Sequence, residues 1–282
     1  MFRRMFRLCV SGAVGSAAFG LLSLTSQSAA AGVAATGSAV VTYNPGTLTS
    51  AYAYSSSSWT SGPAIGLPAI TEGGIFGDTS VITPFNAQYN PANMVGVAGT
   101  GGYIEFQMSQ PIATNGYTIA VQAAAGLDDA SYPSGQTGAT ASDYTFLHQA
   151  TVLVSQDGTN WVSLGDQNFT IPTNIYTDET DPYGGSAASN LADFSKPFTG
   201  TLASFDNENF SQVLATLNGS GGGTWIDLSG TGLSQVDYVA FQTGADETMY
   251  VNAITGIAVP EPASGLLIIG ILSISAKRRR RK

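Results

Sequence analysis

The stretch ATVLVSQDGTNWVSL, residues 150–164, reads as two short strands joined by a tight turn. Apolar residues recur at alternate positions on both sides of Asp157-Gly158, as in strands with one buried face. The pair Asp-Gly is typical of hairpin turns, because glycine readily adopts the positive φ that such turns require. The stretch therefore predicts an antiparallel hairpin and points to an all-β fold.

The same two-residue period recurs elsewhere along the chain. It predicts further strands at 103–108, 117–122, 236–241 and 249–254, and weaker ones at 39–43 and 50–54. Long polar segments at 85–103, 126–146 and 170–197 are expected to be loops that pack over the sheet ends. Together these features predict one antiparallel, jelly-roll-like β-sandwich with long loops.

One short helix is expected within this sandwich. Its apolar stripe, spaced as in a helix, consists of Phe210, Val213, Leu214 and Leu217. Asp206 or Asn207 is suited to cap its start, and Asn218-Gly219 to end it. The run GSGGG at 219–223 lacks the lysine of a phosphate-binding loop, so we interpret it as a flexible turn.

Two short motifs resemble those of known secreted sandwiches. The sequence SQDGTNW at 155–161 is similar to the Ser-x-Asp-Gly-x-x-Trp hairpin of discoidin-like, galactose-binding-fold modules. The sequence GGYIEF at 101–106, followed by Gln110-Pro111-Ile112, is similar to early strands of secreted bacterial sandwiches. The resemblance implies the fold and hints at contact with sugars, although this fold also serves other roles.

The N-terminus has the three parts of a secretory signal peptide. Arg3, Arg4 and Arg7 form a basic region, residues 8–24 are apolar or small, and Ser28-Ala29-Ala30-Ala31 offers a cleavage site. We therefore expect residues 1–31 to be removed by signal peptidase, at a position within Ser28–Ala35. The alternative is a retained N-terminal membrane helix, which the clustered alanines disfavour.

The C-terminus joins a short motif to an apolar stretch and a basic end. The motif consists of Val259, Pro260, Glu261 and Pro262, and residues 263–276 carry no charge. The basic end consists of Lys277, Arg278, Arg279, Arg280, Arg281 and Lys282. A helix of the apolar stretch would be only ~21 Å long against a hydrocarbon core of ~30 Å. We expect marginal, transient membrane insertion, with the basic end on the cytoplasmic side.

This tail, residues 259–282, resembles the PEP-CTERM sorting tail of bacterial envelope proteins. The resemblance implies recognition by an exosortase, cleavage at or near Pro260-Glu261-Pro262, and export linked to extracellular polysaccharide. Residues 32–258 would then be an extracytoplasmic domain. The alternative is an ordinary C-terminal membrane anchor, because hydropathy alone does not separate the two.

The exported domain is strongly acidic. Residues 32–258 contain eighteen acidic side chains and one basic side chain, that of Lys196. Their formal net charge is therefore about −17. Such a surface repels nucleic acid and anionic lipid. The only cysteine, Cys9, lies in the signal region, which excludes disulfides and thiol catalysis in the domain.

The sequence offers three kinds of candidate catalytic or metal site. His148, the only histidine, is more consistent with a surface or edge residue than with a hydrolase triad, since no Gly-x-Ser-x-Gly motif is present. Carboxylates paired in loops are candidates for catalysing glycoside hydrolysis or for binding calcium. Three groups of carboxylates lie close together in sequence: Asp128 with Asp129, Asp178 with Glu179 and Asp181, and Asp206 with Glu208. Of these, Asp178, Glu179 and Asp181, or Asp206 and Glu208, are the candidate calcium ligands, and no other cofactor is expected.

Aromatic residues in polar loops are candidates for stacking on sugars. They are Trp59, Tyr132, Tyr144, Tyr176 and Tyr183. Trp161 and Trp225 are instead expected in the core. The sequence thus favours an exported, non-catalytic envelope or matrix protein that associates with extracellular polysaccharide at the cell surface. The alternatives are a secreted carbohydrate-active hydrolase and a purely structural coat protein.

Overall fold

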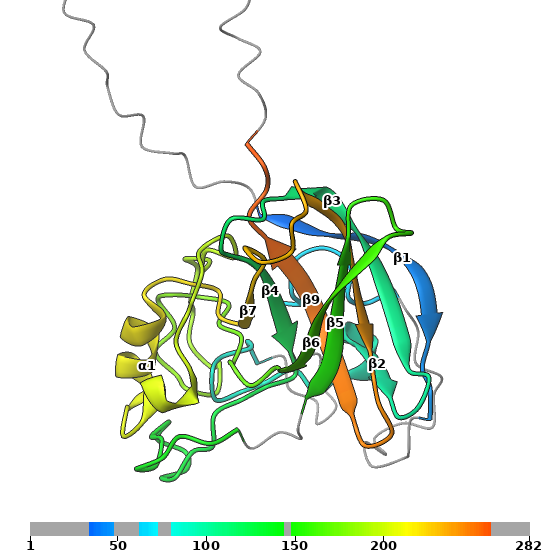
Figure 1. Ribbon diagram of the computed structural model, residues 1–282. Helices are drawn as coiled ribbons and strands as arrows, with labels where there is room; N and C mark the ends of the chain where they lie inside the picture. Colours follow the sequence, from blue (N-terminus) through cyan, green and yellow to red (C-terminus); the bar gives the residue numbers. More distant parts are fainter. Residues whose placement is uncertain (1–33, 48–61, 73–79, 144–147, 261–282) are drawn as a thin grey trace, which may run out of the picture. The chain divides into compact units, whose positions relative to one another are not determined.

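A computed structural model describes residues 34–47, 62–72, 80–143 and 148–260 (Figure 1). It confirms the predicted all-β sandwich with long loops and one short α-helix. The weak strand expected at 50–54 lies outside the described residues.

The described residues form nine strands. Seven of them contain segments that were predicted as strands, whereas Val95–Ala98 lies in a segment expected to be a loop and Thr224–Asp227 was not predicted. The nine strands are β1 (Ala35–Asn44), β2 (Val95–Ala98), β3 (Tyr103–Ile112), β4 (Tyr117–Ala123), β5 (Gln149–Ser155), β6 (Trp161–Asn168), β7 (Thr224–Asp227), β8 (Val236–Gln242) and β9 (Thr248–Gly256). The helical elements are η2 (Pro91–Asn93), η3 (Leu202–Phe205) and α1 (Phe210–Leu217).

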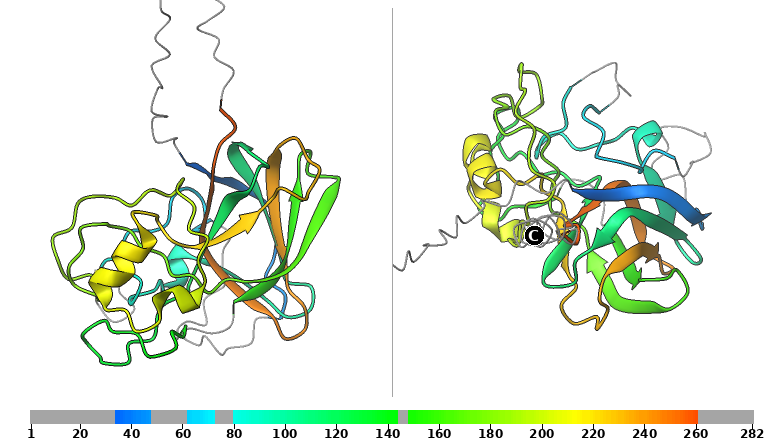
Figure 2. Two further views of the ribbon diagram at one scale, coloured as in Figure 1. Left: turned by 60° about the vertical axis from the view of Figure 1, so that its left-hand side comes forward. Right: turned by 90° about the horizontal axis from the view of Figure 1, so that it is seen from above.

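The strands pair antiparallel in two sheets that share β1 (Figures 1 and 2). In the first sheet the order is β6-β5-β8-β3-β1. In the second sheet β9 pairs with β1 and β2 on one edge and with β4 on the other, and β7 follows β4. β1 joins the sheets because its first two residues pair with β9 and the rest with β3.

The β5–β6 hairpin shows why the motif at 155–161 has its composition. Asp157 Oδ1 accepts hydrogen bonds from the backbone N–H groups of Thr159 and Asn160, both at 2.8 Å. Gly158 has a φ of +71°, and a side chain there would meet the ring of Tyr238. Ser155 Oγ donates to the Asn160 carbonyl at 2.7 Å, which closes the loop. The motif is thus a self-contained turn, as predicted.

The main core lies between the two sheets. Ile104, Phe106 and Met108 of β3 are buried on one face, as their alternation predicts. They pack with side chains of the second sheet such as Val121 and Val251. Edge-to-face contacts between aromatic rings, including Phe106 with Phe241 at 6.3 Å, fill the centre.

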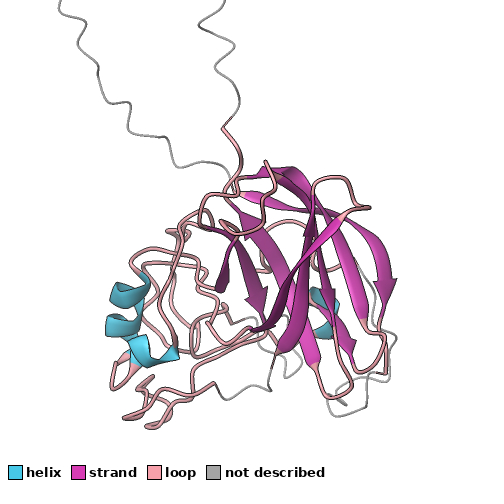
Figure 3. Cartoon of the chain, viewed as in Figure 1, coloured by secondary structure: helices cyan, strands magenta, loops and turns pink. Residues whose placement is uncertain are grey.

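A second apolar cluster lies on the outer face of the second sheet. Ala120 of β4 and Trp225 of β7 pack there against Phe205 and Phe210 from the long segment between β6 and β7. That segment, with α1, covers this face (Figure 3), whereas we expected the long loops at the sheet ends. β4 and β9 are consequently buried on both faces.

Helix α1 carries the predicted apolar stripe but begins at a different cap. Phe210, Val213 and Leu217 are buried, and Asn218 ends the helix in the left-handed conformation. The N-cap is Asn209, whose side chain accepts from the N–H of Gln212 at 3.1 Å. The expectation of Asp206 or Asn207 as cap is therefore wrong by two or three residues.

The glycine run at 219–223 is buried and hydrogen-bonded, so its interpretation as a flexible turn is wrong. Gly221 N–H donates to the Asp193 carbonyl, and Gly223 N–H to the Pro172 carbonyl, both at 3.0 Å. Gly222 has a φ of +69°, and a Cβ there would lie 2.1 Å from the Pro172 oxygen. The glycines allow backbone segments to approach each other closely beneath α1.

Candidate functional site

Two of the predicted sugar contacts form an aromatic pair on two loops, and one of them, Tyr132, is the most exposed of those that the structure describes. The rings of Tyr132 and Tyr183 meet edge to face, with centroids 5.1 Å apart and planes at 71°. Tyr132 is 75 % exposed, while Tyr183 is only partly buried and packs against the second apolar cluster. The structure thus brings two of the five candidate aromatics together, although they are about fifty residues apart in sequence.

Asp129 holds this aromatic pair in place. Its carboxylate accepts from the N–H groups of Ser131, Gly135 and Gln136 at 2.8 to 3.0 Å, which folds the loop that carries Tyr132. The hydroxyl of Tyr183 also donates to Asp129, at 2.9 Å. Burial raises the pKa of Asp129, but these hydrogen bonds outweigh it and hold the pKa below its usual value. The sequence offered Asp129 only as half of a carboxylate pair.

The other candidate aromatics do not join this pair. Tyr176 packs against a small apolar cluster that includes Ile82 and Phe194. Trp59 and Tyr144 lie outside the described residues. Trp225 is buried as expected, with Nε1–H donating to the Gly222 carbonyl, but Trp161 is only half-buried on the edge strand β6.

The carboxylates at 178–181 are mostly engaged by the backbone of their own loop. Asp178 accepts from the N–H of Asn190 at 2.8 Å and of Ser189, which lowers its pKa. Glu179 is buried, and its Oε1 accepts from the N–H groups of Thr180 and Asp181 at 2.9 Å. Asp181 Oδ1 accepts from the Tyr183 N–H at 2.8 Å. These bonds give the carboxylates a structural role in shaping the loop.

The second candidate pair, Asp206 and Glu208, also accepts hydrogen bonds from the protein. Asp206 Oδ1 accepts from the Ala141 N–H, and Glu208 Oε1 from the Thr216 hydroxyl, both at 2.7 Å. Across residues 34–47, 62–72, 80–143 and 148–260, no three acidic or histidine side chains gather in a way that would hold a metal ion. Calcium binding at Asp178, Glu179 and Asp181, or at Asp206 and Glu208, stays a prediction.

His148 is a core residue, which corrects the expectation of a surface or edge histidine. It is 1 % exposed, and its Nε2 lies 3.0 Å from the Ala124 carbonyl. Its ring packs edge to face on Tyr250 at 5.8 Å. Burial lowers its pKa to about 4, so the imidazole is neutral at pH 7, with Nε2 as the donor. The sequence places His148 beside a strand but does not reveal that Ala124, after β4, and Tyr250 of β9 lie against it.

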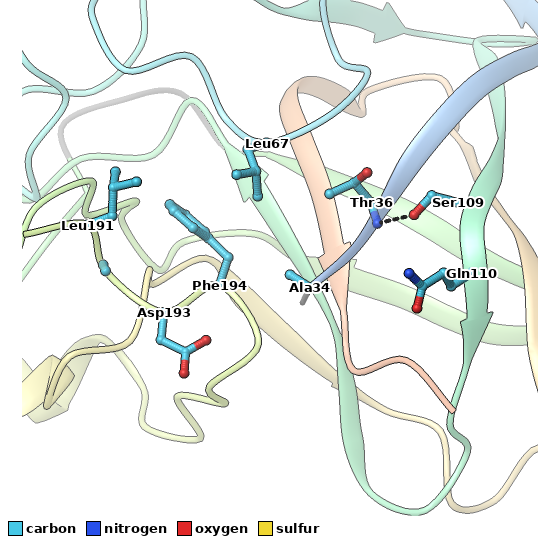
Figure 4. Close-up of a pocket in the computed structure, with 9 residues that line it drawn as sticks. Ala34, Thr36, Leu67, Ser109, Gln110, Leu191, Asp193 and Phe194 are labelled. Atoms are coloured by element: carbon cyan, nitrogen blue, oxygen red, sulfur yellow. Dashed lines mark hydrogen bonds between the residues drawn. The ribbon is translucent and has the colours of Figure 1, made fainter. Parts of the chain in front are cut away.

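An open pocket of about 530 Å³ lies between the sandwich and the long loops (Figure 4). Thr36 of β1 and Gln110 of β3 line one side, and Leu67, Leu191 and Phe194 line the other. Leu67 and Leu191 are 52 % and 56 % exposed. Sequence reasoning missed this pocket because its walls come from four distant segments. The only hint was the apolar content of 62–72, which lacks a strand period.

The two ends of the described domain emerge beside this pocket. Ala34 lines the pocket, and Ala35 pairs with Gly256 at the end of β9. The Val259 N–H donates to the carbonyl of Pro111, the residue after Gln110, at 2.8 Å. Val259 and Pro260 of the predicted processing motif are exposed. Glu261, Pro262 and the basic cluster 277–282 lie outside the described residues.

Comparison of the sequence with protein-family models and with curated proteins finds no match. Within the part of the chain that the structure describes, no helix is long and apolar enough to cross a membrane. The structure by itself thus defines an all-β sandwich with an aromatic pair and an apolar-rimmed pocket.

Proposed function

We propose that the protein is an exported, non-catalytic component of the bacterial cell envelope that associates with extracellular polysaccharide. The observation that carries the binding part of this proposal is the exposed ring of Tyr132 held against Tyr183. A tyrosine ring offers an apolar face to the C–H face of a sugar and a hydroxyl to its polar edge. Because Asp129 fixes both loops, little ordering entropy is lost when a glycan binds.

The export part of the proposal depends on the two ends of the chain. The signal region 1–31 would be removed by signal peptidase, and the tail 259–282 would be cut near Pro260-Glu261-Pro262 by an exosortase-type enzyme. The exposure of Val259 and Pro260 supports this, since a protease needs an accessible segment. The protein would then stay at the cell surface or enter the matrix.

The alternative of a glycoside hydrolase has less support. Such an enzyme needs two carboxyl groups roughly 5 to 10 Å apart that are free to act on the glycosidic bond. Both oxygens of Asp129 accept hydrogen bonds from its own loop and Tyr183, and Asp178 and Asp181 also bind their own loop. These carboxylates therefore stabilise the loops that carry them.

Binding of the processed protein to polysaccharide from its own envelope tests the proposal. Tyr132→Ala is expected to weaken binding about tenfold, the loss of one aromatic contact of ~1.4 kcal/mol. Tyr117→Ala is the matched control, because Tyr117 is 43 % exposed on β4 and has no part in the pair. Equal binding by both variants would contradict the assigned site. Release of reducing ends would establish the hydrolase instead.

A further inference from the structure

The pocket beside the chain ends combines two features that point to a common partner. Its rim exposes Leu67 and Leu191, each more than half accessible, above an apolar floor that includes Phe194. The two leucines thus share the lining of one pocket, together with polar side chains such as Asp193 and Gln110. Figure 4 shows Leu191 and Phe194 on one side of the pocket, Thr36 and Gln110 on the other, and Leu67 between them on the adjoining loop.

The position of the chain ends identifies that partner. Val259 is hydrogen-bonded to Pro111, next to the pocket residue Gln110. Only two residues separate Pro260 from the apolar stretch 263–276. Three extended peptide units reach about 10 Å, so this stretch cannot enter a bilayer unless the pocket end of the body lies against the lipid. The N-terminal boundary at Ala34 lies at the same end.

We propose that the apolar rim, Leu67 and Leu191, contacts the lipid bilayer surface while the C-terminal tail is inserted. This inference rests on the membrane insertion that is part of the proposed function. The body carries about −17 charges, so the contact is hydrophobic and suits zwitterionic lipid rather than anionic lipid. Contact with lipid would also hold Val259-Pro260 at the bilayer surface before cleavage.

The contact can be measured with a polarity-sensitive dye on a single cysteine. The full-length chain carries Cys9→Ser and either Leu67→Cys or Leu191→Cys, and is reconstituted into phosphatidylcholine vesicles with brominated lipid as the quencher. Val41→Cys is the matched control, because Val41 is 53 % exposed on β1. It lies five residues beyond Thr36, about 17 Å along the strand. Unchanged circular dichroism establishes that each labelled chain is folded.

We expect brominated lipid to quench the dye at 67 and at 191 about threefold more than at 41, since an interfacial contact reaches only the first ~5 to 10 Å of the bilayer. Equal quenching at the three sites would overturn the bilayer contact and leave the insertion of the tail intact. A dye at 67 whose emission is blue-shifted but not quenched would mean that protein, and not lipid, covers the pocket. That result would also overturn the bilayer contact. Failure of the chain to float with vesicles would overturn both the contact and the proposed insertion.

Discussion

At the scale of the residue, His148 shows what a single buried side chain contributes. The imidazole is enclosed with Tyr250, and its Nδ1 has no hydrogen-bond partner among the described residues. The sequence places it next to a strand, but its burial depends on β9 and on Ala124 after β4, which lie far away along the chain. Such a contact cannot be predicted from local sequence.

The low pKa of His148 predicts that stability depends on pH. The unfolded chain takes up a proton at His148 near pH 6.5, but the folded protein does so only near pH 4. Stability is therefore complete above pH 6.5 and falls between pH 6.5 and 4, by up to about 3 kcal/mol. Urea unfolding at a series of pH values measures this fall.

His148→Gln is the control, because an amide can still donate to the Ala124 carbonyl but does not titrate. We expect the part of the dependence between pH 6.5 and 4 that is due to His148 to disappear in this variant, whatever its absolute stability. The aspartates whose pKa values are lowered, Asp129, Asp157, Asp178 and Asp227, begin to lose their contribution as pH falls through the usual carboxyl pKa near 4, at the lower end of this interval. Both proteins share this loss, so their difference reports His148 alone. A wild-type protein of constant stability over this interval would contradict the burial of a neutral imidazole.

At the scale of the element, helix α1 shows which features the sequence can predict. The stripe Phe210, Val213 and Leu217 has a period that only a helix satisfies, and it was predicted correctly. The cap was not, because Asp206, Asn207 and Asn209 are nearly equivalent as caps by residue type. The structure distinguishes them, since Asp206 is already bonded to the Ala141 N–H and leaves Asn209 as the cap.

Removal of this cap is expected to weaken the helix. Asn209→Ala should lower the free energy of unfolding by about 1 kcal/mol, because the N–H of Gln212 loses its acceptor. Asn209→Asp keeps that acceptor and should retain most of the stability. Chemical denaturation of the two variants beside the wild type gives both values. An alanine variant as stable as the aspartate variant would mean that Asn209 is not the cap.

At the scale of the whole molecule, the second sheet is the shared wall of two apolar clusters. The first cluster, between the sheets, follows from the alternation in the strands and was predicted from sequence. Of the second cluster, under the long loops, only the α1 stripe was predicted, because Phe85, Phe198 and Phe205 stand singly in polar segments without a period. The aromatic pair and the pocket escaped prediction for the same reason, since each joins loops that are distant along the chain.

This arrangement predicts that the loop layer and the sandwich unfold together. Phe205 is fully buried in the second cluster, and Phe205→Ala should cost about 3 to 5 kcal/mol. Calorimetry should still show one transition at a lower temperature, because β4 and β9 are buried on both faces. Two separate transitions would show that the loop layer is an independent unit.

The proposed export requires that both ends of the chain act as processing signals. Measuring the intact mass of the protein tests this requirement most directly. The protein is recovered from the envelope of the cells that produce it, and its mass is compared with that of the complete chain. Our account predicts that the residues up to about Ala31 and everything after the Pro260-Glu261-Pro262 region are missing. A recovered chain that still ends in the six basic residues 277–282 would contradict it.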